Sequence, residues 1–232
     1  MMWQGGGTVL ALFATAACNS SASAQPPIGS LIDRKSHATR VEADDKLAAR
    51  KTLYQFSACV LKRHRKRVND FVETPLEDAR YPRLRAALAT PDCLAEGGLK
   101  MHPMNFRGAI FDALYRDRFT AAPPDVSVGT IGGLRALNPG DIAGSTQTIL
   151  ALAEFGACTS QRAPEDVHLL LRSQPGSSSE SAAFARLSLI FPNCVPKGET
   201  FSLSKTVARG ALAEGMYWLS KGTWTLPTPV TR

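Results

Sequence analysis

Five cysteines give this 232-residue chain its widest choice of chemistry, since a thiol can act as a nucleophile, bind a metal or form a disulfide. They do not form a quartet with the spacing of a zinc site. Two similar tetrapeptides, "FSAC" ending at Cys59 and "FGAC" ending at Cys158, are followed by "PDC" at Cys93 and "PNC" at Cys194. Because two copies that fold alike must close alike, we predict the disulfides Cys59–Cys93 and Cys158–Cys194.

The N-terminal residues predict a compartment in which such disulfides form. An apolar run at residues 8–17, too short to span a bilayer, precedes the small-residue site "ASA" at 22–24, as in a secretory signal peptide. We expect cleavage after Ala24 and an exported protein, periplasmic or extracellular, whose cysteines are structural. The alternative is lipidation of Cys18, which follows a sequence similar to a lipoprotein cleavage box. No later segment predicts a transmembrane span.

A run of basic residues follows the first "FSAC" and could bind anions. The segment "VLKRHRKRV", residues 60–68, contains five cations around His64, namely Lys62, Arg63, Arg65, Lys66 and Arg67. The matching segment of the other copy is "TSQRAPEDV", residues 159–167, so the fold itself does not require the basic run. Most of the net charge of +7 lies in the first half, because residues 25–119 hold 18 basic and 12 acidic residues.

Two interpretations of this basic run stay open. It could be a solvated segment that only relieves a helix dipole. It could also bind an anionic envelope component such as lipid head groups, polysaccharide or an acidic protein. Nucleic acid is the less favoured partner, because no aromatic platform accompanies the charges.

Four arginines occupy matching positions in the two copies: Arg85 with Arg186, and Arg107 with Arg209. The second pair opens the related segments "RGAIFDALY", residues 107–115, and "RGALAEGMY", residues 209–217. Glycine costs a helix about 1 kcal/mol relative to alanine, so its presence in both copies predicts a close approach of another helix, for example the one ending at the disulfide. The arginines could pair internal carboxylates or carbonyls; the alternative is one anion site per copy.

Motifs for enzymatic chemistry are missing from the sequence. It contains no nucleophile elbow, no P-loop and no zinc-protease motif, and its four histidines are scattered. We therefore expect no cofactor and no metal, and we favour a non-enzymatic interaction or scaffold protein of the envelope. The alternative is an envelope-acting hydrolase or transferase with a site between the two copies.

The elements that must position these residues are helices. Apolar residues recur at helical spacing and strand signals are scarce, so we predict an all-α fold made of two tandem disulfide-stapled units of about four helices each. The expected organisation is a signal peptide at 1–24, a flexible segment at 25–43, unit 1 at 44–119, a linker at 120–144, unit 2 at 145–222 and a tail at 223–232. We call unit 1 the first copy and unit 2 the second copy.

The repeated pattern F-x-A-C, P-[DN]-C and R-G-A with a downstream tyrosine resembles a group of exported bacterial helical-repeat proteins of unassigned function. The resemblance covers most of residues 44–219. It implies a shared helical unit, and it implies no activity and no catalytic residue.

Overall fold

The computed structural model describes residues 28–76, 78–94, 101–127, 131–132, 144–195, 203–222 and 224–225. The predicted signal peptide, Cys18, most of the predicted linker and most of the predicted tail lie outside these residues. The chain divides into two compact parts, Met1–Glu42 and Ala43–Arg232. Residues 28–42 of the first part are helical. The second part holds both copies and is described below.

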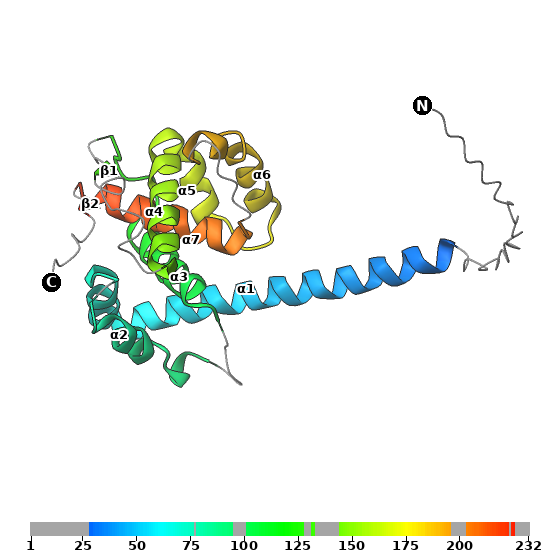
Figure 1. Ribbon diagram of the computed structural model, residues 1–232, viewed down its shortest axis with the longest axis horizontal. Coiled ribbons are helices and arrows are strands. Elements are labelled where there is room, and N and C mark those ends of the chain that lie inside the picture. Colours follow the sequence, from blue (N-terminus) through cyan, green and yellow to red (C-terminus); the bar gives the residue numbers. More distant parts are fainter. Residues whose placement is uncertain are drawn as a thin grey trace, which may run out of the picture. The chain divides into compact units, whose positions relative to one another are not determined.

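The first copy contains three long elements and one short one. These are α1 (Ile28–Glu73), α2 (Tyr81–Leu88), the 3-10 turn η1 (Pro91–Cys93) and α3 (Pro103–Arg118), shown in Figure 1. The backbone of α1 leaves the helical conformation at His64, with φ −128° and ψ 36°. This break divides the helix at the basic run. α1 begins at Ile28, so Asp44 and Asp45 lie inside the helix.

The second copy repeats the same order of elements, with two helices, α4 and α5, in the place of the broken helix α1. It contains α4 (Gly144–Arg162), α5 (Pro164–Arg172), α6 (Ser178–Leu187), the 3-10 turn η4 (Phe191–Cys194) and α7 (Lys205–Ser220). Between α4 and α5, Ala163 has φ −144° and ψ 59°, at the position that matches His64. Pro164 then opens α5, where its missing N–H and fixed φ suit a first turn. The two copies therefore break their first long helix at the same place.

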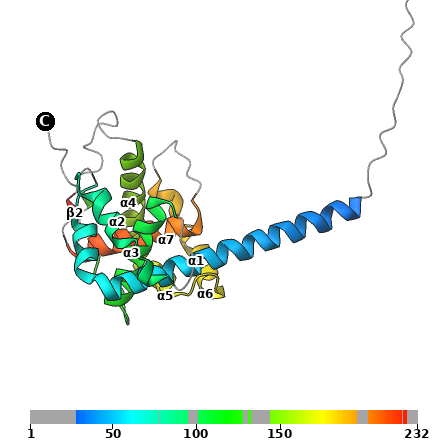
Figure 2. The same cartoon turned by 90° about the horizontal axis from the view of Figure 1, so that it is seen from below.

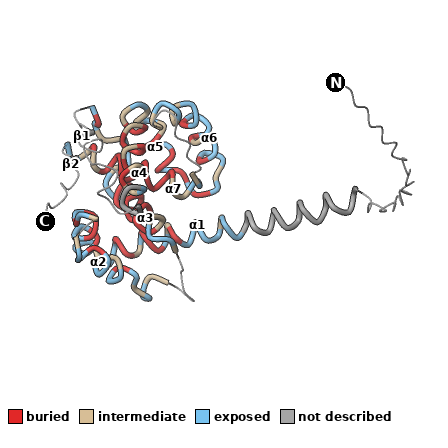
Figure 3. Tube along the Cα trace, viewed as in Figure 1, coloured by how far each residue is buried: buried red, intermediate tan, exposed pale blue. Residues whose placement is uncertain are grey.

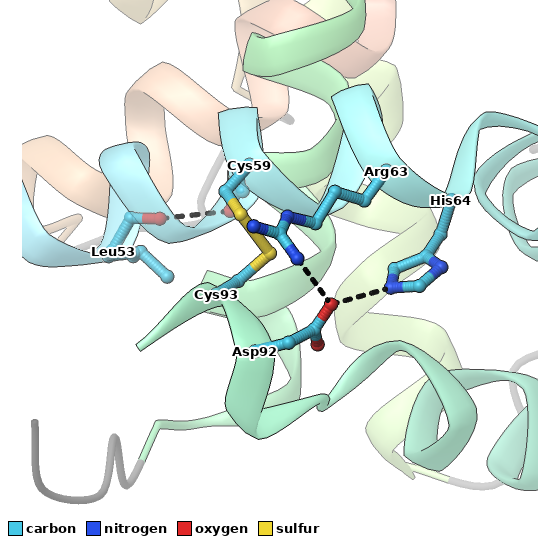
Figure 4. The surroundings of a disulfide bond; sticks show 7 residues. Leu53, Cys59, Arg63, His64, Asp92 and Cys93 are labelled. Carbon is cyan, nitrogen blue, oxygen red and sulfur yellow. Dashed lines mark hydrogen bonds and ion pairs between the residues drawn. A yellow bond between two sulfur atoms is a disulfide. The ribbon is translucent and has the colours of Figure 1, made fainter. Parts of the chain in front are cut away.

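The described residues confirm the predicted all-α fold with two disulfides. Cys59–Cys93 and Cys158–Cys194 are both bonded, each with a Cα–Cα distance of 5.6 Å. Each bond joins the first long helix of a copy to its 3-10 turn, as Figure 4 shows for the first. Regular strand in the described part is limited to β1 (Ile131–Gly132) and β2 (Trp224–Thr225), which pair in parallel.

The core forms where α3 of the first copy packs on α7 of the second. Figures 1 and 2 show these helices adjacent in two views, and Figure 3 shows both as largely buried. A Cβ on Gly108 would lie 2.7 Å from the Cα of Gly210. The predicted close approach is thus confirmed, and the partner is the matching glycine of the other copy rather than the helix that ends at the disulfide.

A second close contact joins α4 to α7 within the second copy. A Cβ on Gly156, in "FGAC", would lie 1.9 Å from the carbonyl oxygen of Ala211, and a Cβ on Gly215 would meet the backbone of Gly156 at 2.4 Å. α7 therefore packs against α4 and α3 through backbone-to-backbone contacts. This arrangement fixes the relative position of the two copies.

Candidate functional site

The basic run lies on the surface at the break in α1. All five cations, Lys62, Arg63, Arg65, Lys66 and Arg67, are exposed, whereas their neighbours Leu61 and Val68 are buried in the core. The non-helical backbone at His64 separates Lys62 and Arg63 from the other three cations of the run.

Two of the five cations have carboxylate partners. Arg63 lies 3.3 Å from Asp92, next to the first disulfide, and His64 Nε2 lies 3.4 Å from the same oxygen without hydrogen-bond geometry (Figure 4). Arg65 donates two hydrogen bonds to Asp117, at 2.8 and 2.9 Å, and these bonds lower the pKa of the Asp117 carboxyl. Both pairs are exposed, so each adds little stability.

The other three cations, Lys62, Lys66 and Arg67, have no carboxylate within ion-pair distance among the residues that the structure describes. The second copy places acids near the same break: Asp166, in α5, binds Arg186. The first copy thus presents uncompensated positive charge where the second copy presents a paired acid and base.

A groove of about 960 Å³ lies beside this run, between the two copies. Residues of α1 from Lys51 to Arg65 form one wall, residues 112–117 of α3 form another, and residues 174–177 of the second copy close the third side. Lys62 and Arg65 belong both to the basic run and to this groove. The sequence predicted a basic segment; the groove and the role of Lys51 in it could not be deduced from a local pattern.

The groove contains Asp112, which is buried and paired on two sides. Its carboxylate accepts hydrogen bonds from Arg209 and Arg116, each at 2.9 Å. Beside it lies Tyr54, whose ring is 5.1 Å from the Arg209 guanidinium carbon and whose hydroxyl is buried without a hydrogen-bond partner. Burial raises the pKa of the Tyr54 hydroxyl, so this group stays protonated.

The shared arginines Arg107 and Arg209 are buried and form part of the core. Arg107 of the first copy binds Glu214 of the second at 2.6 and 3.1 Å, and also binds the Tyr81 hydroxyl. Arg209 of the second copy binds Asp112 of the first. Each arginine therefore pairs with the acid that lies five positions after the other arginine, across the Gly108–Gly210 crossing.

These contacts decide between the two interpretations of the shared arginines. Arg107 and Arg209 are occupied by internal carboxylates, and Arg209 also donates to the carbonyl of Leu171 at 2.7 Å, so neither is an open anion site. Arg186 lies on the surface with Asp166, and Arg85 is half-exposed in α2. The pairing roles of Asp112 and Glu214 were not predicted from the sequence, although these acids occupy matching positions in the repeated segments.

Histidine offers no second site in the described residues. His168 is buried and its Nδ1 lies 2.7 Å from the Tyr115 hydroxyl; burial, and then the charge of Arg172, lower its pKa. His102 caps α3 by accepting from Met104 N. Within the described part of the chain, no group of three His, Cys, Asp or Glu side chains is arranged to hold a metal ion.

Comparison with known proteins found no matching family model, no significantly similar curated protein and no significantly similar solved structure. The resemblance to exported helical-repeat proteins therefore stays a prediction. Among the described residues, none of the helices is long and apolar enough to cross a membrane.

Proposed function

We propose that this chain is an exported, non-enzymatic interaction protein of the bacterial envelope, which binds an anionic partner through the basic run of its first copy. The observation that carries the proposal is the difference between two otherwise matching helix breaks. At His64 the break is surrounded by five exposed cations, and at Ala163 it is not. The second copy folds without the run, so stability alone does not explain it.

Physical chemistry supports attraction at this surface. An exposed Lys or Arg near an anionic membrane contributes about 1 kcal/mol, and the attraction fades over about 8 Å at physiological salt. Lys62, Lys66 and Arg67 have no carboxylate partner in the described part, so their charge is available to a ligand. Binding by these residues is electrostatic and weakens as salt rises.

The test replaces Lys62, Arg63, Arg65, Lys66 and Arg67 with Gln. We expect the variant to keep its thermal transition, because only exposed ion pairs are lost. We also expect it to elute from heparin and from anionic vesicles at much lower salt than the unmodified protein. The salt concentration at elution and the temperature of the thermal transition are measured on the same preparations.

A matched control removes five exposed charges outside the run: Arg80, Arg83, Arg118, Arg162 and Lys205. Net charge changes equally in both variants, so only the position of the charge differs. If the control loses retention as strongly as the first variant, net charge and not the basic run is responsible. If the first variant unfolds, the run is structural.

A hydrolase or transferase acting on envelope material is the alternative, and the groove between the copies favours it. Asp112 is the buried carboxylate in that groove, but its two arginine partners hold it as an ion pair. Hydrolytic release of reducing sugar or acyl groups from envelope extract, measured with the purified protein, would support this alternative over a binding protein.

A further inference from the structure

The groove between the copies carries two positive charges that the fold does not neutralise. Four cations line it: Lys51, Lys62, Arg65 and Arg116. Arg65 is bound to Asp117, and Arg116 is bound to Asp112. Lys51 and Lys62 are exposed and have no acidic partner among the residues that the structure describes. These two ammonium groups are therefore available to a ligand in the groove.

The positions of the two lysines define the shape of such a ligand. Lys51, Gln55, Ala58 and Lys62 follow one another at helical spacing and all line the groove, so they form one stripe of α1. Eleven residues of helix separate the two lysines by about 16 Å. This is the spacing of their backbones along the helix, and an extended chain with repeated acidic groups can pair with both lysines along it.

The groove lining also includes uncharged polar side chains. Gln55 faces the groove from α1, and Gln174 and Ser177 face it from the loop before α6. Their amides and hydroxyl can donate to and accept from ligand hydroxyl groups. Ala58 and Ala113 keep the groove open between them. Tyr54 is the one aromatic residue of this lining, so successive nucleic-acid bases find no stacking platform.

We propose that this groove binds a short stretch of acidic polysaccharide, with Lys51 and Lys62 pairing with carboxylates on separate sugar units. The inference rests on the proposed function and specifies its ligand and its site. Charges placed apart along a recess, with hydrogen-bonding side chains between them, fit a polymer with one acid per sugar. A membrane surface would contact protruding cations, and Lys66 and Arg67 lie outside the groove lining.

Two variants with equal loss of charge test the site: Lys51→Gln with Lys62→Gln inside the groove, and Arg83→Gln with Arg162→Gln, two exposed residues outside both the groove and the basic run. The probe is a galacturonic acid tetramer, with its methyl-esterified form as the uncharged control, and binding is measured by calorimetry on the full exported chain. We expect the groove variant to lose about tenfold in affinity, since two exposed ion pairs with the ligand are removed. The outside variant should change affinity by less than about threefold.

Several results would overturn the proposal. Equal losses in the two variants would show that net charge determines the affinity and that the groove is not the site. If the unmodified protein binds an acidic hexapeptide or anionic vesicles but not the tetramer, the groove proposal fails while the proposed function stands. If the unmodified protein binds none of these anions, the proposed function fails as well. Thermal unfolding of each variant checks that the fold is intact.

Discussion

Arg107 and Arg209 each bind a carboxylate that belongs to the other copy. The pairs Arg107–Glu214 and Arg209–Asp112 are buried, and each arginine directly precedes a glycine of the crossing. Removing one partner of a buried pair costs about 3–5 kcal/mol, because the other charge is left uncompensated. At the scale of residues, the two copies are therefore joined by exchanged ion pairs, and the residues left for function are those that only one copy has.

His168 gives a residue-scale prediction about pH. Burial lowers its pKa below the ordinary value of 6.5, so the unfolded chain takes up a proton that the folded protein excludes. The contribution of His168 to the free energy of unfolding should be fully present above pH ~6.5, and it should be lost as the pH drops below that value. Replacing His168 with Asn, the residue at the matching position 69, should reduce this fall. Urea unfolding between neutral and mildly acidic pH gives the slope of the free energy of unfolding against pH for the unmodified protein and for the variant. Equal slopes would contradict the assignment of this pH dependence to His168.

The helices are positioned by glycines and by a repeated break. Gly108 meets Gly210 where α3 crosses α7, and Gly156 meets α7 where it crosses α4. His64 and Ala163 end the first helical segment of each copy at matching points. The same break thus serves two purposes: in the second copy it only turns the chain, and in the first copy it also presents the basic run beside the groove.

Substitution of the crossing glycines gives an element-scale prediction. Gly108→Ala should lower the free energy of unfolding by about 1–3 kcal/mol, because the added methyl group meets the backbone of Gly210 and outweighs the better helix propensity of alanine. Gly156→Ala should cost more, since its Cβ would lie 1.9 Å from a carbonyl oxygen. Denaturant unfolding measures both. If Gly108→Ala raises the free energy of unfolding instead, α3 and α7 can move apart to admit the methyl group without a loss of stability.

Combining Gly108→Ala with Gly210→Ala extends this test. The two methyl groups disturb one contact, so their costs should not add. Additive costs would indicate two independent sites, contrary to the direct crossing of α3 and α7.

Much of this arrangement could be predicted from the repeated sequence. The disulfide pairs, the order of helices and the need for glycine in "RGA" follow from matching residues at matching positions. The partner of each arginine could not be predicted, because it depends on which helices cross and not on local sequence. The groove was missed for the same reason: Lys51 and Gln174 lie in different copies and become neighbours only when the copies pack.

At the scale of the whole molecule, neither copy is complete without the other. Each has its own disulfide, but each places a buried arginine against an acid of its partner copy. The helices α3 and α7 also cover each other at the glycine crossing. The duplication therefore forms one cooperative structure from two similar halves, and only one half carries the basic run.

Separated copies test this interdependence. Residues 44–119 and 145–222, each expressed with its disulfide formed, should fail to fold as monomers because each leaves a buried arginine unpaired. Circular dichroism and size-exclusion chromatography follow each fragment alone and the two together. We expect mixing to restore helical structure in a one-to-one complex. A fragment that unfolds cooperatively as a monomer would contradict the claim that each copy needs the carboxylate supplied by the other.

The most direct measurement of where the molecule works is amide chemical-shift mapping with the galacturonic acid tetramer or a heparin fragment. We predict shifts in the first copy between Lys51 and Arg67 and in residues 174–177, which close the groove. The matching break around Ala163 should stay unchanged and serves as an internal control. Shifts of equal size at both breaks, or shifts at neither, would contradict the claim that the basic run makes the first copy the binding half.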